Sequence, residues 1–151
     1  HLFIKHGGTE LVCRLIDARF PDYKVVIPAD NPYSLMVNRN DFQGALRRVQ
    51  VFSNKSTNQV ALTISGSELQ LAAQDMDFSF EGNERMKCTY DGDKLQIAFN
   101  SKFLIEMLNG VDTDELKMEL STATKAGIIK PTEQDPSEDL LMLVMPLMLN
   151  S

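Results

Sequence analysis

Residues 94–120 read KLQIAFNSKFLIEMLNGVDTDELKMEL, and the spacing of the apolar side chains changes twice along this stretch. Apolar and polar residues alternate in KLQIAF and again in ELKMEL, which is typical of half-buried strands. Between them, NSKFLIEMLNGV has apolar residues three and four apart, which predicts a helix capped by Asn100 and stopped at Gly110. The stretch therefore predicts a strand over 94–99, a helix over 101–110 and a strand near 115–121.

The same succession occurs once before, in the first half of the chain. NDFQGALRRVQVF, residues 40–52, has apolar residues at helical spacing, with Asn40 in position to cap a helix over about 41–52. A strand near 34–38 precedes it. The side chains expected on the apolar stripes are Phe42, Leu46, Val49 and Phe52 in the first helix, and Phe103, Leu104, Met107, Leu108 and Val111 in the second.

More strand-like segments follow each helix, so the order β-α-β-β-β occurs twice in about 115 residues. Each copy has one helix face and one sheet face to bury, so the two copies should pack on each other, with helices on one side and antiparallel sheets on the other. The predicted class is α+β. The further strands are expected at about 59–65, 68–74, 77–81 and 85–90 in the first copy, and near 126–130 and 140–148 in the second.

The first thirty residues stand apart from this repeat. LFIKHGGTELVCRLI predicts a hairpin that turns at Gly7-Gly8, and a lone hairpin is marginally stable in water. We therefore expect residues 1–30 to be the last hairpin and linker of a preceding domain, and residues 31–151 to be a domain of their own. Because the chain starts at His1 rather than Met, we expect it to be part of a longer protein.

Motifs and composition argue against an enzyme, a metal protein and a membrane protein. The sequence has no GxSxG, P-loop, GxGxxG or His-Glu pair at metal spacing, and no run of 18 apolar residues. Cys13, Cys88 and the histidines share no ligand spacing, and His6 lies beside the hairpin turn. The acidic stretches YDGDK and PTEQDPSED are expected to be a turn and a loop. We expect a non-catalytic cytoplasmic protein with reduced cysteines and no cofactor.

The end of the chain, LLMLVMPLMLNS over residues 140–151, is apolar on both faces. Proline has no N–H to donate to a neighbouring strand, so strand pairing should stop at Pro146. Two interpretations remain open: the last core strand, or a surface on which partners dock. The first fits residues 140–143. We favour the second for residues 144–149, because methionines adapt to different partners.

LIDARFPDYKVVIP (residues 15–28), the MPL near the end and the doubled β-α-β-β-β between them resemble the bacterial sliding clamp, the beta subunit of DNA polymerase III. The resemblance covers essentially the whole chain and implies the third domain of that family, preceded by the tail of the second. It implies a ring of two three-domain subunits, closed head to tail around duplex DNA, that tethers the polymerase. With the first domain missing, we expect this chain alone to form no ring.

The formal net charge of −6 argues against ordinary nucleic-acid binding, because clustered Lys and Arg supply the counterion release that drives it. The resemblance removes this objection, since topology retains a closed ring and only its inner surface needs positive charge. The helices line the hole in this family. Polar residues on exposed helix faces are equally expected to be merely solvated. The side chains that the resemblance places near the DNA backbone are Arg47, Arg48, Lys102 and Asn109.

The resemblance also implies a pocket in which polymerases, clamp-loader subunits and repair proteins dock short linear peptides. Many clamps carry Arg at the positions of Val25 and Met148, so charged contacts to a peptide are expected to be weaker here. The preceding domain supplies the other half of that pocket. The matching positions in this chain are Pro21, Val25, Val26, Leu143, Val144, Met145, Pro146, Leu147, Met148 and Leu149.

A joint between subunits is the last feature that the resemblance implies. Val51 and Phe52 match its apolar part, although Phe52 is equally compatible with a core position. The acidic residues that we expect to face basic residues of the other subunit are Asp75, Asp77, Glu81 and Glu84. The competing interpretation is a β-rich adaptor or structural domain that associates with itself through its C-terminal strand.

Overall fold

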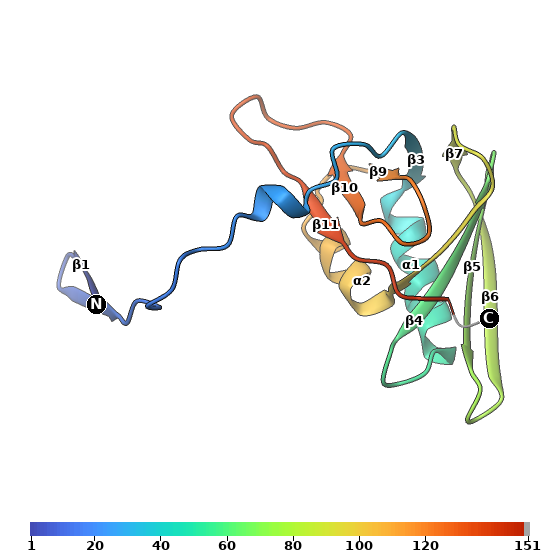
Figure 1. The fold of residues 1–151 in the computed structure, drawn as a ribbon, viewed down its shortest axis with the longest axis horizontal. Helices are drawn as coiled ribbons and strands as arrows, with labels where there is room; N and C mark the ends of the chain where they lie inside the picture. The colour runs from blue at the N-terminus through green and yellow to red at the C-terminus, as the bar shows by residue number, and fades with distance from the viewer. Residues whose placement is uncertain (150–151) are drawn as a thin grey trace.

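The doubled β-α-β-β-β order is confirmed in the computed structural model, which describes residues 1–149 (Figure 1). A short strand, β7 (Thr89–Tyr90), separates the two copies. The first copy consists of β3 (Tyr33–Asn38), α1 (Arg39–Val49), β4 (Gln59–Ser65), β5 (Glu68–Asp75) and β6 (Phe80–Lys87). The second consists of β8 (Leu95–Asn100), α2 (Ser101–Asn109), β9 (Glu115–Leu120), β10 (Gly127–Pro131) and β11 (Met142–Val144).

The two copies exchange their first strands. One sheet has the order β11-β10-β9-β3-β7, so β3 of the first copy joins the sheet of the second. The other has the order β6-β5-β4-β8, so β8 of the second copy joins the sheet of the first. Both junctions are antiparallel ladders, with Leu35 opposite Met118 and Leu62 opposite Ile97. The exchange links the copies by backbone hydrogen bonds as well as by packing.

The core lies between the sheets and the helices. Alternate residues of the strands point inward, as the period-two pattern predicts, and the two helices pack side by side against them (Figure 1). Burial of each large aliphatic side chain contributes about 1.5–3 kcal/mol relative to exposure. The largest fully buried side chains are Phe42, Phe99, Leu35, Leu46, Leu62, Ile64, Leu69, Leu71, Ile97, Leu104, Leu108 and Leu116. The predicted α+β class is confirmed.

The helix ends agree with the prediction for the second helix and differ for the first. Asn100 caps α2 by accepting from the N–H groups of Lys102 and Phe103, and Gly110 closes it. For α1, the predicted cap Asn40 is wrong. Asn38, still in extended conformation at the end of β3, accepts from the Asp41 N–H at 3.0 Å, so the helix starts at Arg39.

Two aromatic residues of the predicted stripes are not buried. Phe103 is 57% exposed, because each residue advances about 100° around a helix and only the neighbouring Leu104 then faces the core. The first helix ends at Val49, and a short 3-10 turn, η2 (Gln50–Phe52), leaves Phe52 39% exposed.

Two predicted strands are also wrong in their bounds. Residues 76–79 form a turn rather than a strand over 77–81, because the chain must reverse before Phe80 can pair with Asp75. β6 then runs without a break through residues 82–84, which separate the strands predicted at 77–81 and 85–90. The last strand is shorter than the predicted 140–148, since β11 covers only Met142–Val144.

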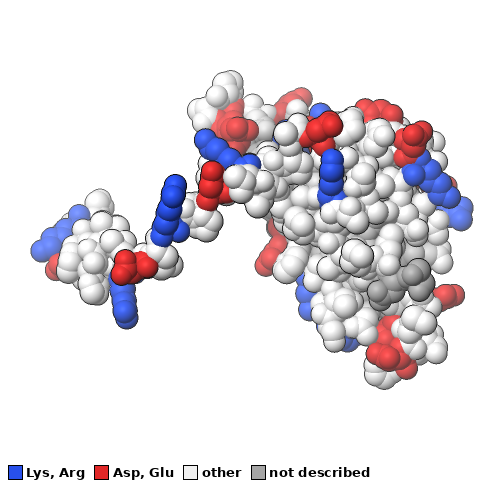
Figure 2. Space-filling model, viewed as in Figure 1, with Lys and Arg blue, Asp and Glu red and all other residues white. Residues whose placement is uncertain are grey.

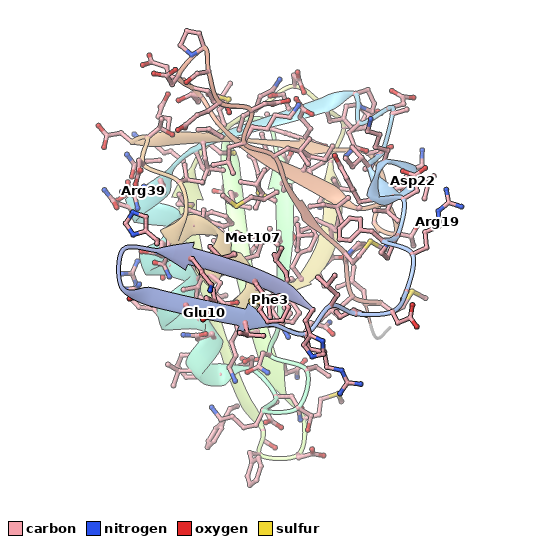
Figure 3. The ribbon with its side chains drawn as sticks, turned by 90° about the vertical axis from the view of Figure 1, so that its left-hand side faces the viewer. Phe3, Glu10, Arg19, Asp22, Arg39 and Met107 are labelled. Carbon is pink, nitrogen blue, oxygen red and sulfur yellow. The ribbon has the colours of Figure 1, made fainter. Side chains whose placement is uncertain are left out.

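Strands β1 (Leu2–His6) and β2 (Thr9–Cys13) form the predicted hairpin, with Gly7 in the left-handed region at φ 57°. The hairpin lies away from the rest of the structure. The linker that contains Arg19 and Asp22 connects the hairpin to one side of the main body (Figures 1 and 3). Asn31 fixes the end of this linker, because its side-chain amide donates to the carbonyls of Glu119 and Ala126 at 3.0 and 2.9 Å. None of the described helices is long and apolar enough to span a membrane.

Gly82 on β6 is a position where only glycine fits. A Cβ there would lie 2.3 Å from Cδ2 of Phe52. We predict that Gly82→Ala lowers the free energy of unfolding by about 1–3 kcal/mol, because the ring of Phe52 must move. Gly8→Ala is the control, since a Cβ there meets no atom within 4 Å. Urea denaturation of both variants tests this, and a Gly82→Ala protein as stable as the control would contradict it.

Candidate functional site

The C-terminal end of the chain crosses from one sheet to the other. β11 pairs with β10, from Ile129 opposite Met142 to Gly127 opposite Val144. The pairing then stops, as predicted for a chain that reaches Pro146. The next N–H, that of Leu147, donates to the carbonyl of Ala98 on β8 at 2.7 Å. The end of the chain is therefore fastened to the edge of both sheets.

Residues 145–149, hereafter the C-terminal tail, expose apolar side chains at this crossing. Met145 is 61% exposed and Met148 is 77% exposed, whereas Val144 just before them is buried. Leu147 and Leu149 are half-buried. The core-strand interpretation therefore fits Val144 and fails for the tail. The middle of this face carries few charged side chains, which lie mainly around its rim (Figure 2).

The segment with RFPDY supplies a second set of exposed apolar residues. Tyr23–Val26 form a 3-10 turn, η1, capped by Asp22, whose carboxylate accepts from the Lys24 N–H at 3.2 Å. Val25 and Val26 are 78% and 58% exposed, and η1 lies beside β11 in both ribbon views (Figures 1 and 3). Pro21, also exposed, precedes this turn in the linker. The structure thus brings η1 to the face that carries the tail.

A hollow of about 580 Å³ lies over the outer face of the four-stranded sheet. Its lining is rich in amide side chains, including Gln59, Gln70 and Gln96, and Leu149 is the only tail residue that reaches it. Met145 and Met148, the most exposed residues of the tail, do not line this hollow.

The four polar residues assigned to the helices differ in their partners. Arg47 and Lys102 are exposed, and no carboxylate of the described residues lies within ion-pair distance of either. Arg48 instead forms a two-point ion pair with Glu84 of β6, with Nε to Oε2 at 3.0 Å. Asn109 accepts a hydrogen bond from the Gln43 side chain at 2.9 Å, which links α2 to α1. Arg47 and Lys102 are thus the cations least engaged within the chain.

The residues assigned to the subunit joint lie around β6. Val51 is 62% exposed, and the ring of Phe52 covers Gly82. Asp75 was expected to face another subunit, but it is 3% exposed and its carboxylate accepts from the Asp77 N–H at 3.1 Å. This burial corrects its assignment, because a carboxylate inside its own turn does not meet a partner's charge. Glu81 points to the outer face of the sheet, opposite Gln74.

The sequence interpretation missed three exposed apolar residues at the turn between β5 and β6. Met76, Phe78 and Phe80 are all more than half exposed. The apolar residues are visible in the letters MDFSF, but the sequence analysis predicts a strand over 77–81 there. Only the position of the turn shows that these side chains project from the body.

Residues 24–146 match the family model described as "DNA polymerase III beta subunit, C-terminal domain". The chain belongs to this family. Among curated relatives, the Beta sliding clamp of Chlamydia muridarum is 29% identical over 147 residues, which cover 97% of this chain and 38% of the relative. That of Pseudomonas aeruginosa is 26% identical over 149 residues, 99% of this chain and 40% of the relative.

Solved structures of sliding clamps show the same fold. A Bartonella birtlesii DNA polymerase III subunit beta is 32% identical and has a TM-score of 0.87, over 97% of this chain and 41% of that one. The Thermotoga maritima beta subunit is 32% identical with a TM-score of 0.84, over 93% and 37%. A B. birtlesii sliding clamp bound to griselimycin is 34% identical with a TM-score of 0.83, over 89% and 35%. The chain thus spans about two fifths of the length of the relatives it matches.

The Arg48–Glu84 pair predicts a pH-dependent contribution to stability. The hydrogen bonds and charge of Arg48 hold the pKa of Glu84 below its usual value. A carboxylate with a lowered folded-state pKa stabilises the protein above its unfolded pKa, about 4.3, and loses that contribution as the pH falls through the folded pKa. We predict that Glu84→Gln is less stable than the wild type at pH 7 and that the difference shrinks below about pH 4.

Urea denaturation at both pH values measures this difference. The effect should be modest, because the Arg48 side chain is 64% exposed and solvent screens the pair. Glu81→Gln, on the same strand and outside the ion pairs of the described residues, is the matched control. An equal stability loss for Glu84→Gln at both pH values would show that the pair is not the cause.

Proposed function

We propose that this chain is the C-terminal part of a sliding-clamp subunit that encircles duplex DNA and performs no chemistry itself. The family membership and the relatives named Beta sliding clamp support this role. In this role, the full-length subunit forms a head-to-tail ring with a second copy and works in the cytoplasm. The ring tethers DNA polymerase III, clamp-loader subunits and other polymerases and repair proteins to DNA.

The exposed C-terminal tail is the observation that carries the partner-binding part of this proposal. Val144 fixes the chain in the core, Pro146 ends the ladder, and Leu147 anchors to β8, so Met145 and Met148 are held on the surface. Methionine side chains repack against different partners at low cost. Together with Val25 and Val26 on η1, they form one wall of a groove for short linear peptides, and Pro21 and the preceding domain supply the rest.

The affinity of this groove for a linear peptide is expected to be modest. Burial of two or three apolar peptide side chains contributes about 1.5–3 kcal/mol each. Ordering a flexible peptide offsets several of those kcal/mol, which leaves a Kd on the order of micromolar. The absence of Arg at Val25 and Met148 fits a groove that depends on apolar contact. Such affinity allows partners to exchange.

Contact with DNA is assigned to the helices in this proposal. Arg47 on α1 and Lys102 on α2 are exposed, and the Gln43–Asn109 hydrogen bond holds the two helices side by side. Loose contacts to phosphates position a protein without reading sequence, which suits a ring that slides. Arg48 and Asn109 have partners inside the chain and take a smaller part in this contact.

Met145→Asp and Leu147→Asp test the peptide groove. Griselimycin, which is bound to the B. birtlesii clamp in a solved structure, is the probe. We predict that either substitution in the full-length subunit weakens griselimycin binding at least about 30-fold, since a carboxylate replaces an apolar side chain of the proposed groove and must lose water on binding. Calorimetric titration measures the Kd.

Val51→Asp is the matched control, because Val51 is as exposed as Met145 but lies at the joint beside β6. Its affinity for griselimycin should equal that of the wild type. Unchanged griselimycin affinity in both tail variants would defeat the assignment of the groove.

Salt dependence tests the contact with DNA. We predict weak binding of the subunit to a short duplex, with affinity that falls as salt rises. Arg47→Ala and Lys102→Ala should each reduce the salt slope by about one, and Lys125→Ala, in the turn before β10, should not. Fluorescence anisotropy across a salt series measures this. Tight binding that salt does not weaken would contradict a sliding contact.

A further inference from the structure

Amide side chains surround the hollow on the outer face of the four-stranded sheet. Gln59 on β4, Gln70 on β5 and Gln96 on β8 line it from three neighbouring strands, and Asn83 lines it from β6. Its volume is about 580 Å³. The hollow therefore reaches across all four strands of this sheet.

Small residues form the floor of the hollow. Ala61 and Ala72 lie opposite each other on β4 and β5, and both line it. Alternate residues of a strand share one face, so Gln59 and Ala61 face outward together, as do Gln70 and Ala72. Because a methyl group leaves room above the strands, the main chain of a ligand can approach the sheet between the longer amide side chains.

The glutamines of the hollow have unused hydrogen-bonding groups. Gln43, on α1, donates to Asn109 at 2.9 Å. By contrast, the side-chain amides of Gln59, Gln70 and Gln96 make no hydrogen bond to another residue within 1–149. A glutamine amide can donate through its NH₂ group and accept through its oxygen. Each of these three side chains is therefore available to a ligand.

The lining of the hollow selects a neutral polar ligand. Among the described residues, no Lys, Arg or aromatic ring lines it, so it lacks both the charge that holds a phosphate and the stacking surface that holds a base. Its carboxylates belong to Asp77, which accepts from Asn54 at 3.4 Å, and to Glu81. Peptide groups suit this lining, because each carries one donor and one acceptor and so matches a glutamine amide.

The C-terminal tail leads into the hollow. The Leu147 N–H donates to the Ala98 carbonyl at 2.7 Å, which fixes the tail on β8 at one edge of this sheet. Ala98 lies opposite Ala61 of the floor. Leu149, two residues beyond Leu147, lines the hollow. The surface that we assign to peptide binding and the hollow therefore share Leu149.

The width of the sheet sets the length of the segment that fits. β8 and β6 are the outer strands of this sheet, so three inter-strand spacings of about 4.8 Å separate them. An extended chain advances about 3.3 Å per residue, so about four residues span this distance. Gln96 and Gln70 both lie opposite Thr63, one on each side of it, and so form a row along this path.

We propose that the hollow receives about four polar residues of a partner peptide, next to the apolar residues that dock on the tail. Gln59, Gln70 and Gln96 form hydrogen bonds with the peptide groups of this segment. The inference rests on the proposed function, and it extends the peptide groove from Leu149 across the outer face of the sheet. The added contacts serve partners of different sequence, since all of them carry the same main-chain groups.

Overlapping synthetic peptides of the catalytic subunit of DNA polymerase III from the same organism supply the probe. The full probe is the peptide that binds the full-length clamp subunit and is displaced by griselimycin. The short probe is the same peptide trimmed at both ends to its apolar residues. We predict that Gln70→Ala/Gln96→Ala weakens binding of the full probe at least about fivefold, because hydrogen bonds are lost, and leaves the Kd of the short probe unchanged.

Calorimetric titration measures both Kd values. Gln50→Ala is the matched control, because Gln50 lies in η2 and does not line the hollow. This variant should bind the full probe as the wild type does. The side-chain amide resonances of Gln59, Gln70 and Gln96 give a second readout: they should shift when the full probe is added and stay in place with the short one.

Equal affinity of the double variant and the wild type for the full probe would overturn the inference, while displacement by griselimycin would still support the groove at the tail. If griselimycin displaces no polymerase peptide, the proposed groove fails, and the inference fails with it. A double variant that keeps its peptide affinity but raises the Kd of the dimer in sedimentation would place a second copy in the hollow and would also overturn the inference.

Discussion

The exchange of first strands between the two β-α-β-β-β copies determines which strands lie at the edges of the four-stranded sheet. Since β8 pairs with β4, it forms the outer edge of the four-stranded sheet, next to the end of its own copy. The tail can therefore leave β10, pass Pro146 and reach Ala98 within a few residues. The same exchange leaves β6 at the opposite edge of that sheet, where it pairs only with β5 among the described residues. The chain's own end thus contacts one edge through a backbone hydrogen bond, and no strand of residues 1–149 pairs with the other.

These two edges carry different surfaces. At the β8 edge, the Leu147 N–H donates to the carbonyl of Ala98, and the exposed side chains of the tail are the flexible methionines Met145 and Met148. Such a surface suits partners that bind briefly and differ in sequence. At the other edge, β6 pairs only with β5 among the described residues, and the stacked rings of Phe78 and Phe80 lie at its start.

Much of the fold follows from local patterns that a single sequence displays. The helical spacing between two alternating segments predicts α2, and Asn100 and Gly110 give its ends because both act through contacts within a few residues. Pro146 likewise predicts the end of the strand, since it lacks an N–H whatever surrounds it. The exchange of β3 and β8 was not predictable in this way, because it depends on pairing between distant segments.

In the candidate sites, too, features set by local sequence are predictable and features set by distant segments are not. Exposure of the tail follows from its composition and from Pro146. The positions of Asp75 and Glu84 do not, because their burial and their ion pair depend on where the chain turns after β5 and on how α1 crosses β6. For the same reason, MDFSF was interpreted as a strand, although it forms a turn that presents Phe78. Errors of this kind arise where alternation in the sequence coincides with a reversal of the chain.

The central claim is that the C-terminal tail, residues 145–149, is a binding surface and not part of the core. Methyl resonances of methionine, recorded as griselimycin is added to the full-length subunit, test it most directly. The account predicts that the methyl signals of Met145 and Met148 shift, while that of the buried Met118 stays in place. Saturation with griselimycin that leaves the signals of Met145 and Met148 unchanged would contradict it.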